Sequence, residues 1–274
     1  MSVQTHMSRR IFPQSTRDFE SNALHRIATT LIPLHSNKDH HPAASVSIRD
    51  YTLAPKQQLF EPCLRHSNYT IIPVVGTLNY SLCSGMRDCT ENYQDVDDNN
   101  LSSFVCPGET LEFCGCNTAG LTFCNPFDTE LINFIVIETT DFPQGSPQGS
   151  NTEWIESAPD TLMKTLVPVK KNIQEAKTNF DINAQLNSLV PVKAHPSGYR
   201  LLIGKFGGRE DYIFTPTNIR RSVILYVIEG AFEAAECLLE DRDALLLTGL
   251  AHVEFEALSN NAIVLIIELP QQVG

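Results

Sequence analysis

The sequence predicts an all-β protein with few short helices, and three observations predict that fold class. Short segments rich in β-branched and aromatic residues recur about every 8–12 residues, which is typical of sandwiches and barrels. Apolar residues alternate with polar ones in segments such as 45–49 (SVSIR), as expected for a half-buried strand. Turn residues, among them Pro107-Gly108 and Glu229-Gly230, separate these segments.

Strand-like segments form two groups separated by a change in composition. Residues 139–160 are rich in Pro, Gly and Ser, which is typical of a linker between domains. We therefore expect four parts. They are an irregular lead-in over 1–43 with room for one strand, an N-terminal domain over 44–140, a linker and bridging segment over 141–195, and a C-terminal domain over 196–274.

Composition and charge exclude several classes of protein. The 274 residues are 42% hydrophobic and 19% charged, a globular rather than a disordered balance. A net charge of −12 argues against direct nucleic-acid binding, which needs a basic face. No apolar run approaches the roughly 18 residues of a membrane span, and no apolar segment follows the first basic residues. We expect a cytoplasmic protein without a membrane partner.

The cysteines and histidines give no clear metal pattern. Seven of the eight cysteines lie between Cys63 and Cys124, and Cys114-Gly115-Cys116 is the tightest pair. A structural zinc site normally shows two such pairs, and a second one does not follow here. His40-His41 are adjacent, so in a strand they would point apart. The simplest interpretation is that the cysteines are reduced thiols and that the two histidines lie in a solvated loop. The clustering of the cysteines leaves a thiol-based redox sensor open.

Five segments resemble a known family. The chain is similar to pirin-like proteins, which are bicupins of the cupin superfamily, in IIPVVGTLNY (71–80), CNPFDTELINFIVIE (124–138), GKFGGREDYIF (204–214), YVIEGAFEAAECLLEDRDALLL (226–247) and VEFEALSNNAIVLIIEL (253–269). The second-half motifs are the more specific ones. This resemblance implies two tandem cupin jelly-roll barrels packed face to face.

The resemblance also implies a place for a metal, and this sequence departs from the family there. Metal-bearing pirins carry HPHRG before a strand and His-x-Glu after a later turn. Aligning on Gly76 puts their two histidines at Pro62 and Leu64 and their arginine at Arg65. Aligning on Pro107-Gly108 puts the His-x-Glu at Leu121 and Phe123. None of these four side chains can coordinate a metal, so we expect a divergent member without the metal site and without a cofactor.

The resulting functional hypothesis is a non-catalytic, regulatory protein that binds a protein partner or a small apolar ligand. Pirins that resemble this chain include transcriptional co-regulators acting through protein partners. The candidate pocket is the interior of the first barrel, lined by Leu64, Arg65, His66, Leu121 and Phe123, with Arg65 as its polar anchor. All four ligand positions should then converge inside that barrel.

Two alternatives remain open at this point. The first is a metal-dependent, quercetinase-like cupin dioxygenase whose ligands lie elsewhere, for instance at His66. The second is the thiol-based redox sensor. The sequence leaves the oligomeric state, the ligand and the order of residues 1–43 open.

Overall fold

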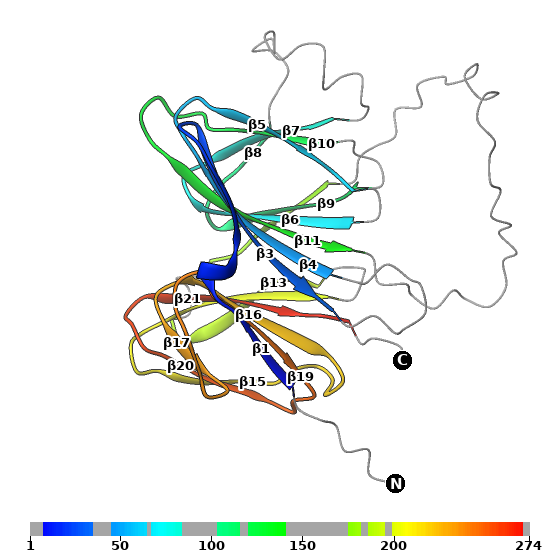
Figure 1. Cartoon of the computed structure of the whole chain (residues 1–274), viewed down its shortest axis with the longest axis vertical. Helices are drawn as coiled ribbons and strands as arrows, with labels where there is room; N and C mark the ends of the chain where they lie inside the picture. Colours follow the sequence, from blue (N-terminus) through cyan, green and yellow to red (C-terminus); the bar gives the residue numbers. More distant parts are fainter. Residues whose placement is uncertain are drawn as a thin grey trace, which may run out of the picture.

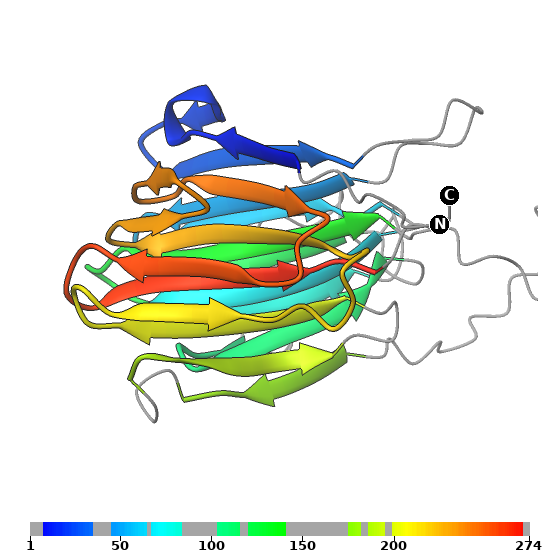
Figure 2. The ribbon, with the colours of Figure 1, turned by 90° about the horizontal axis from the view of Figure 1, so that it is seen from below.

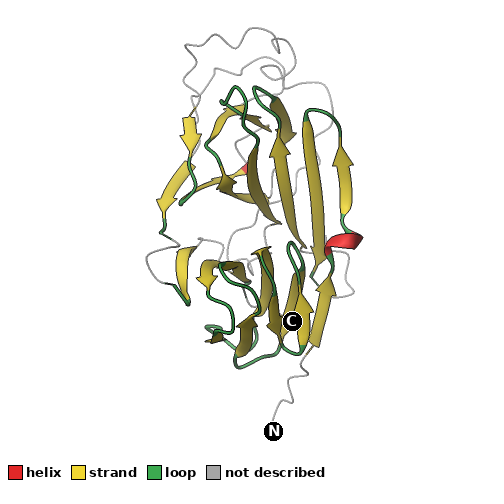
Figure 3. Cartoon of the chain, turned by 90° about the vertical axis from the view of Figure 1, so that its left-hand side faces the viewer, coloured by secondary structure: helices red, strands yellow, loops and turns green. Residues whose placement is uncertain are grey.

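The computed structural model describes residues 8–34, 45–64, 67–83, 103–115, 120–140, 175–181, 186–194 and 199–270. Within these ranges the chain is built almost entirely of antiparallel β-strands, and the helix η1 (Gln14–Thr16) is a single turn (Figure 3). No helix among the described residues is long and apolar enough to cross a membrane. The predicted all-β fold class is confirmed.

The strands form four sheets, which are named here by their position. The outer N-terminal sheet has the order β5 (Gln58–Pro62), β10 (Gly120–Cys124), β7 (Leu78–Cys83), β8 (Ser103–Val105). The inner N-terminal sheet has the order β12 (Glu175–Asn179), β9 (Glu109–Cys114), β6 (Ser67–Val75), β11 (Ile132–Thr140), β4 (Ser45–Leu53), β3 (His25–Pro33), β2 (Asp18–Ser21). The inner C-terminal sheet has the order β1 (Ser8–Phe12), β19 (Ala244–Thr248), β16 (Ser222–Glu229), β21 (Ala262–Glu268), β14 (Arg200–Phe206), β13 (Ser188–Ala194). The outer C-terminal sheet has the order β15 (Asp211–Phe214), β20 (Val253–Ala257), β17 (Phe232–Ala234), β18 (Cys237–Leu239).

Each outer sheet packs on its inner sheet to make one barrel, and the two inner sheets face each other (Figure 1). Three hydrophobic cores fill the spaces between the layers, one inside each barrel and one between the barrels. The core between the barrels combines Ile72 and Ile135 of the first barrel with Ile224 and Leu265 of the second. Fully burying each such side chain contributes about 1.5–3 kcal/mol, so this interface is a substantial part of the fold.

Segments of the chain cross between the two barrels at both edges. β1 pairs with β19 in the second barrel, whereas β2 and β3, which follow directly, belong to the first. At the other edge, β12 pairs with β9 in the first barrel and β13 pairs with β14 in the second. Figure 2 shows these crossing strands on opposite sides of the stacked sheets, the N-terminal ones in blue and β12 and β13 in yellow-green.

The lead-in and the bridging segment therefore hold more structure than the sequence suggested. Residues 8–34 form three strands rather than at most one, and β12 and β13 lie inside the segment expected to be a linker. Trp154, within that expected linker, lies outside the described residues. Two of these strands, β1 and β2, are short and mostly exposed, so they lack a strong apolar alternation.

The two barrels repeat the same turns. Gly76 follows β6 with φ +78° and Gly230 follows β16 with φ +83°. In the next turn, the Cys106 N–H donates to Glu109 Oε2 (2.9 Å) and the Glu240 N–H donates to Asp243 Oδ2 (3.0 Å). The residue before each acid has a positive φ, and it is Gly108 in one barrel and Arg242 in the other. Only the glycine adopts that conformation without strain.

Candidate functional site

The interior of the first barrel is a packed aromatic core. Tyr51 stacks on Phe134 with ring centroids 5.0 Å apart, and Phe123 lies 4.7 Å from Phe134. On β10, Leu121 and Phe123 point to the same face because side chains alternate along a strand, and both are completely buried in this core.

The four expected ligand positions do not converge. Pro62 is exposed at the end of β5, and Leu64, two residues later, is 60% exposed. The prediction that Leu64 lines an interior pocket with Leu121 and Phe123 is therefore wrong. The chain leaves β5 at Pro62 and turns outward before β6 begins, which carries Leu64 to the surface. Arg65 and His66 lie outside the described residues.

A cluster of charged and hydroxyl side chains occupies the end of the first barrel next to that turn. We call it the Arg49 cluster, and it consists of Arg49, Tyr51, Glu61, Ser67, Tyr69 and Glu138. Arg49 Nη1 pairs with Glu61 Oε1, and Arg49 Nη2 donates to Glu138 Oε2 at 2.7 Å. The side chains of these three residues are only 11–15% exposed.

Hydroxyl groups also form hydrogen bonds with the carboxylates of Glu61 and Glu138. The Tyr51 hydroxyl donates to Glu61 Oε2 (2.9 Å), and the Ser67 hydroxyl donates to Glu138 Oε1 (2.8 Å). The Tyr69 hydroxyl lies 3.2 Å from the same Glu138 oxygen and accepts the N–H of Leu64 at 2.7 Å. The cluster thus ties the exposed turn to the barrel.

The electrostatic environment keeps Arg49 charged and the tyrosines neutral. Burial by itself would lower the pKa of the Arg49 guanidinium. The acidic groups around it, Tyr51, Glu61 and Glu138, outweigh that effect and raise its pKa above the usual value. Burial raises the pKa of both Tyr51 and Tyr69 well above the normal range for a phenol. Arg49 therefore acts as a fixed cation between two carboxylates.

These residues do not fit the metal that the resemblance implies. Pro62, Leu64, Leu121 and Phe123 offer no side-chain donor atom, and both carboxylates of the Arg49 cluster are already engaged by a guanidinium and hydroxyl groups. Among the described residues, no group of three or more His, Cys, Asp or Glu side chains is arranged to hold a metal ion.

The corresponding end of the second barrel has a related arrangement. Glu268 is completely buried at the end of β21, as Glu138 is near the end of β11. Arg200 Nη1 lies 2.7 Å and Arg221 Nε 3.6 Å from the Glu268 carboxylate, and the Thr217 N–H donates to it at 2.8 Å. Both barrels thus carry a guanidinium–carboxylate pair at this end.

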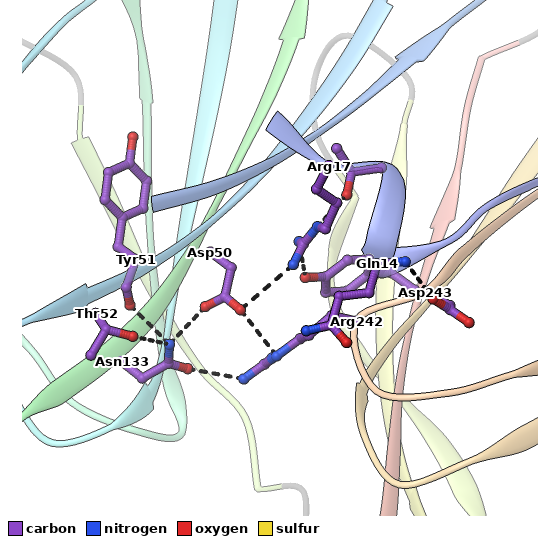
Figure 4. A network of polar contacts seen from close by, with 10 residues as sticks. Gln14, Arg17, Asp50, Tyr51, Thr52, Asn133, Arg242 and Asp243 are labelled. Atoms are coloured by element: carbon purple, nitrogen blue, oxygen red, sulfur yellow. Dashed lines mark hydrogen bonds and ion pairs between the residues drawn. The ribbon is translucent and has the colours of Figure 1, made fainter. Parts of the chain in front are cut away.

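A second polar cluster lies between the barrels, and Figure 4 shows most of it. We call it the Asp50 cluster, and it consists of Arg17, Asp50, Asn133, Tyr226 and Arg242. Asp50 follows Arg49 directly on β4, so the two side chains point to opposite faces of the sheet. Arg242 Nε lies 3.0 Å and Arg17 Nη1 3.9 Å from Asp50 Oδ2. This cluster joins the lead-in, the first barrel and the second barrel.

The described cysteines do not form an obvious redox centre. Cys106, Cys124 and Cys237 are free thiols. Burial raises the pKa of Cys124, which is the opposite of what a reactive thiolate needs. Three further cysteines lie at positions whose side chains are not described, and the redox-sensor hypothesis stays a prediction.

The sequence reasoning missed the residues of both clusters. A signal for them is present in hindsight: Arg49 and Asp50 interrupt an apolar strand, and Glu138 ends one of the most apolar segments of the chain. A charge within a buried strand normally has a partner, but the partner cannot be read from one sequence.

Comparisons with known proteins identify the fold. No family model and no curated protein matches the chain. Solved structures do match over nearly the whole chain. YhhW from Escherichia coli has a TM-score of 0.66 at 13% identity, covering 96% of this chain and 98% of that one. The same bacterial pirin, in complex with nickel(II), has a TM-score of 0.63 at 12% identity, covering 96% and 100%. YhaK from Escherichia coli has a TM-score of 0.59 at 14% identity, covering 94% and 95%. The chain therefore has the double cupin barrel of pirin-like structures, and at these identities the likeness shows the fold alone.

Proposed function

We propose that this protein with a pirin-like fold is a non-catalytic regulator that binds a protein partner. The Arg49 cluster is the observation that supports a non-catalytic role. A cupin oxygenase needs imidazole and carboxylate ligands around a metal with an open side for substrate and dioxygen. Here Arg49 lies between Glu61 and Glu138, and the barrel behind them is filled by aromatic rings.

The solvent face of the outer C-terminal sheet supports the proposal that the protein binds a partner. We call it the acidic face, and it consists of Asp211, Ile213, Glu233, Leu238, Glu254 and Glu256. This sheet lies on the side of the second barrel away from the first barrel (Figure 1). Asp211 pairs with Glu256 and Glu256 with Glu233, so three carboxylates stand in one row across three strands.

Such a row is unfavourable in the free protein. Like charges directly opposite each other destabilise an antiparallel pair, and Arg209, 3.4 Å from Glu256, offsets only part of the charge. Ile213 and Leu238 on the same face are each 60% exposed. A partner segment that carries lysine or arginine beside apolar residues would complement both features, so the proposal commits to a basic protein segment.

Peptide binding tests the proposal that the acidic face binds a partner. A synthetic peptide of alternating lysine and leucine serves as the probe, and fluorescence anisotropy at 0.15 M salt measures its affinity. The double variant Glu233→Gln/Glu254→Gln should bind the peptide about tenfold more weakly, because it removes two of the carboxylates. The control Glu20→Gln/Asp128→Asn removes the same charge at exposed positions outside this sheet and should bind as the parent does. Equal losses in both variants, or no binding by the parent, would contradict the proposal.

Metal content tests the proposed non-catalytic role independently. The protein is purified without a metal-affinity tag, incubated anaerobically with ferrous iron, desalted and measured by elemental analysis. We expect far less than one metal per chain. About one iron per chain would favour the dioxygenase alternative, whatever the result with the peptide.

A further inference from the structure

The Asp50 cluster buries more positive than negative charge. The side chain of Arg17 is only 3% exposed, and those of Asp50 and Arg242 are 12% and 18% exposed. Both guanidinium groups approach the same oxygen, Asp50 Oδ2, and Asp50 is the carboxylate with which each of them pairs. The nearby Asp243 instead accepts the N–H groups of Gln14 and Glu240. Among the residues that the structure describes, one buried positive charge is left without a counter-charge, which is costly in a folded protein.

The same two arginines also have N–H groups for which no described residue is the acceptor. Arg17 donates from Nε to the Thr30 hydroxyl and from Nη2 to the Tyr226 hydroxyl, both at 2.7 Å. Arg242 donates from Nη2 to Asn133 Oδ1 at 3.2 Å. Within the described part of the chain, the Nη1 atoms of both arginines are buried and have no hydrogen-bond partner. Donors of this kind cost more than neutral ones when left unsatisfied.

Arg242 is also held in a backbone conformation that a glycine would adopt more easily. Its φ is +69°, and the equivalent turn of the first barrel has Gly108 at this position. Strained backbone of this kind is typical of functional positions. Here the strained turn directs the Arg242 side chain toward Asp50 and Asn133 (Figure 4).

We propose that the Asp50 cluster is a binding site for a small monovalent anion, chloride in the cell, held by the Nη1 groups of Arg17 and Arg242. A single negative charge balances the excess, and a one-atom anion accepts hydrogen bonds from two directions. Larger anions such as phosphate do not suit the site, because it adjoins the completely buried Tyr226 and the hydrophobic core between the barrels. The bound anion would join the two barrels and the lead-in, independently of any partner on the acidic face.

Thermal unfolding of the full chain at constant sodium concentration and ionic strength tests the site, with chloride replacing gluconate stepwise. A ligand that binds the native state raises Tm in a saturable way. We expect such a rise for the parent and for the control Arg9→Gln, which changes an exposed arginine of the same N-terminal segment. Arg242→Gln should lose the rise. Asp50→Asn, which removes the competing carboxylate, should reach half-saturation at about tenfold lower chloride, equivalent to about 1.4 kcal/mol.

Crystals soaked in bromide give a second readout that does not depend on the folding of any variant. An anomalous peak within hydrogen-bond distance of both Nη1 atoms is the expected result. A water molecule at that place without an anomalous peak would overturn the proposal. A chloride response that persists unchanged in Arg242→Gln would overturn it as well.

Discussion

At the scale of single residues, Arg49 is the cation that two nearly buried carboxylates share. Such an arrangement adds little net stability compared with an apolar core of the same shape. Removing only the cation is different, because it leaves Glu61 and Glu138 buried without a counter-charge.

We therefore predict that Arg49→Met lowers the free energy of unfolding by about 3–5 kcal/mol at pH 7. Urea unfolding at pH 7 measures it.

Two further variants make this prediction specific. Arg49→Met/Glu61→Gln/Glu138→Gln should recover most of the loss, because it removes both charges. Arg9→Met, which changes an exposed arginine paired with Glu236, should stay within about 0.5 kcal/mol of the parent. An Arg49→Met variant as stable as the parent would show that the cluster has no energetic role.

The sequence predicted part of the site at this scale. The resemblance placed Leu121 and Phe123 inside the first barrel, and both are buried in its core. The position of Leu64 depends on where β5 ends and how the next turn leaves the sheet. The pairing of Arg49 with Glu138 joins residues far apart in the sequence. The position of Leu64 and this pairing therefore could not be derived from a local sequence pattern.

At the scale of elements, the strands that cross between the barrels could not be predicted from the sequence. Strongly apolar strands such as β11 and β21 have a clear sequence signal, because buried strands appear as nearly continuous hydrophobic runs. β1 and β2 are short, mostly exposed edge strands, and edge strands carry a weak pattern. The partner of β1 is β19, which comes much later in the chain, so the exchange between barrels is set by tertiary packing.

β1 covers an edge that would otherwise be open. It pairs with β19 over five residues, and Phe12 at its end belongs to the core between the barrels. We predict that deleting residues 1–12 lowers Tm and causes association, because an uncovered edge strand pairs with other chains. Dynamic light scattering and thermal unfolding measure both effects.

A point substitution controls for general damage to this strand. Ile11→Thr changes an exposed side chain of β1 while keeping its backbone pairing, so it should leave both readouts as in the parent. A truncated chain with the parent's size distribution and Tm would show that β1 does not protect the edge.

At the scale of the whole molecule, the core between the barrels makes the two barrels one folding unit. Ile135 and Ile224 belong to that same core, although they come from different barrels. When such an interface is apolar and extensive, neither side is stable with its inner face exposed. The two barrels expected from the sequence are thus linked by crossing edge strands and coupled in energy through the core that they share.

We predict a single unfolding transition by calorimetry, with calorimetric and van't Hoff enthalpies in agreement. Phe134→Ala inside the first barrel and Phe232→Ala inside the second are matched variants, since both remove a completely buried phenylalanine. Each should shift the one transition downward, by about 3–5 kcal/mol in free energy. If either variant produced two resolved transitions, the barrels would be independent.

The crossing strands have a consequence for any attempt to divide the chain. A break anywhere in residues 141–174 leaves β1 of the second barrel on the first fragment and β12 of the first barrel on the second fragment. Neither half contains a complete barrel, and each holds a strand that the other lacks. The two halves are therefore built as obligate complements: produced separately, they should regain the native structure only by reassembling with each other, as a split protein does.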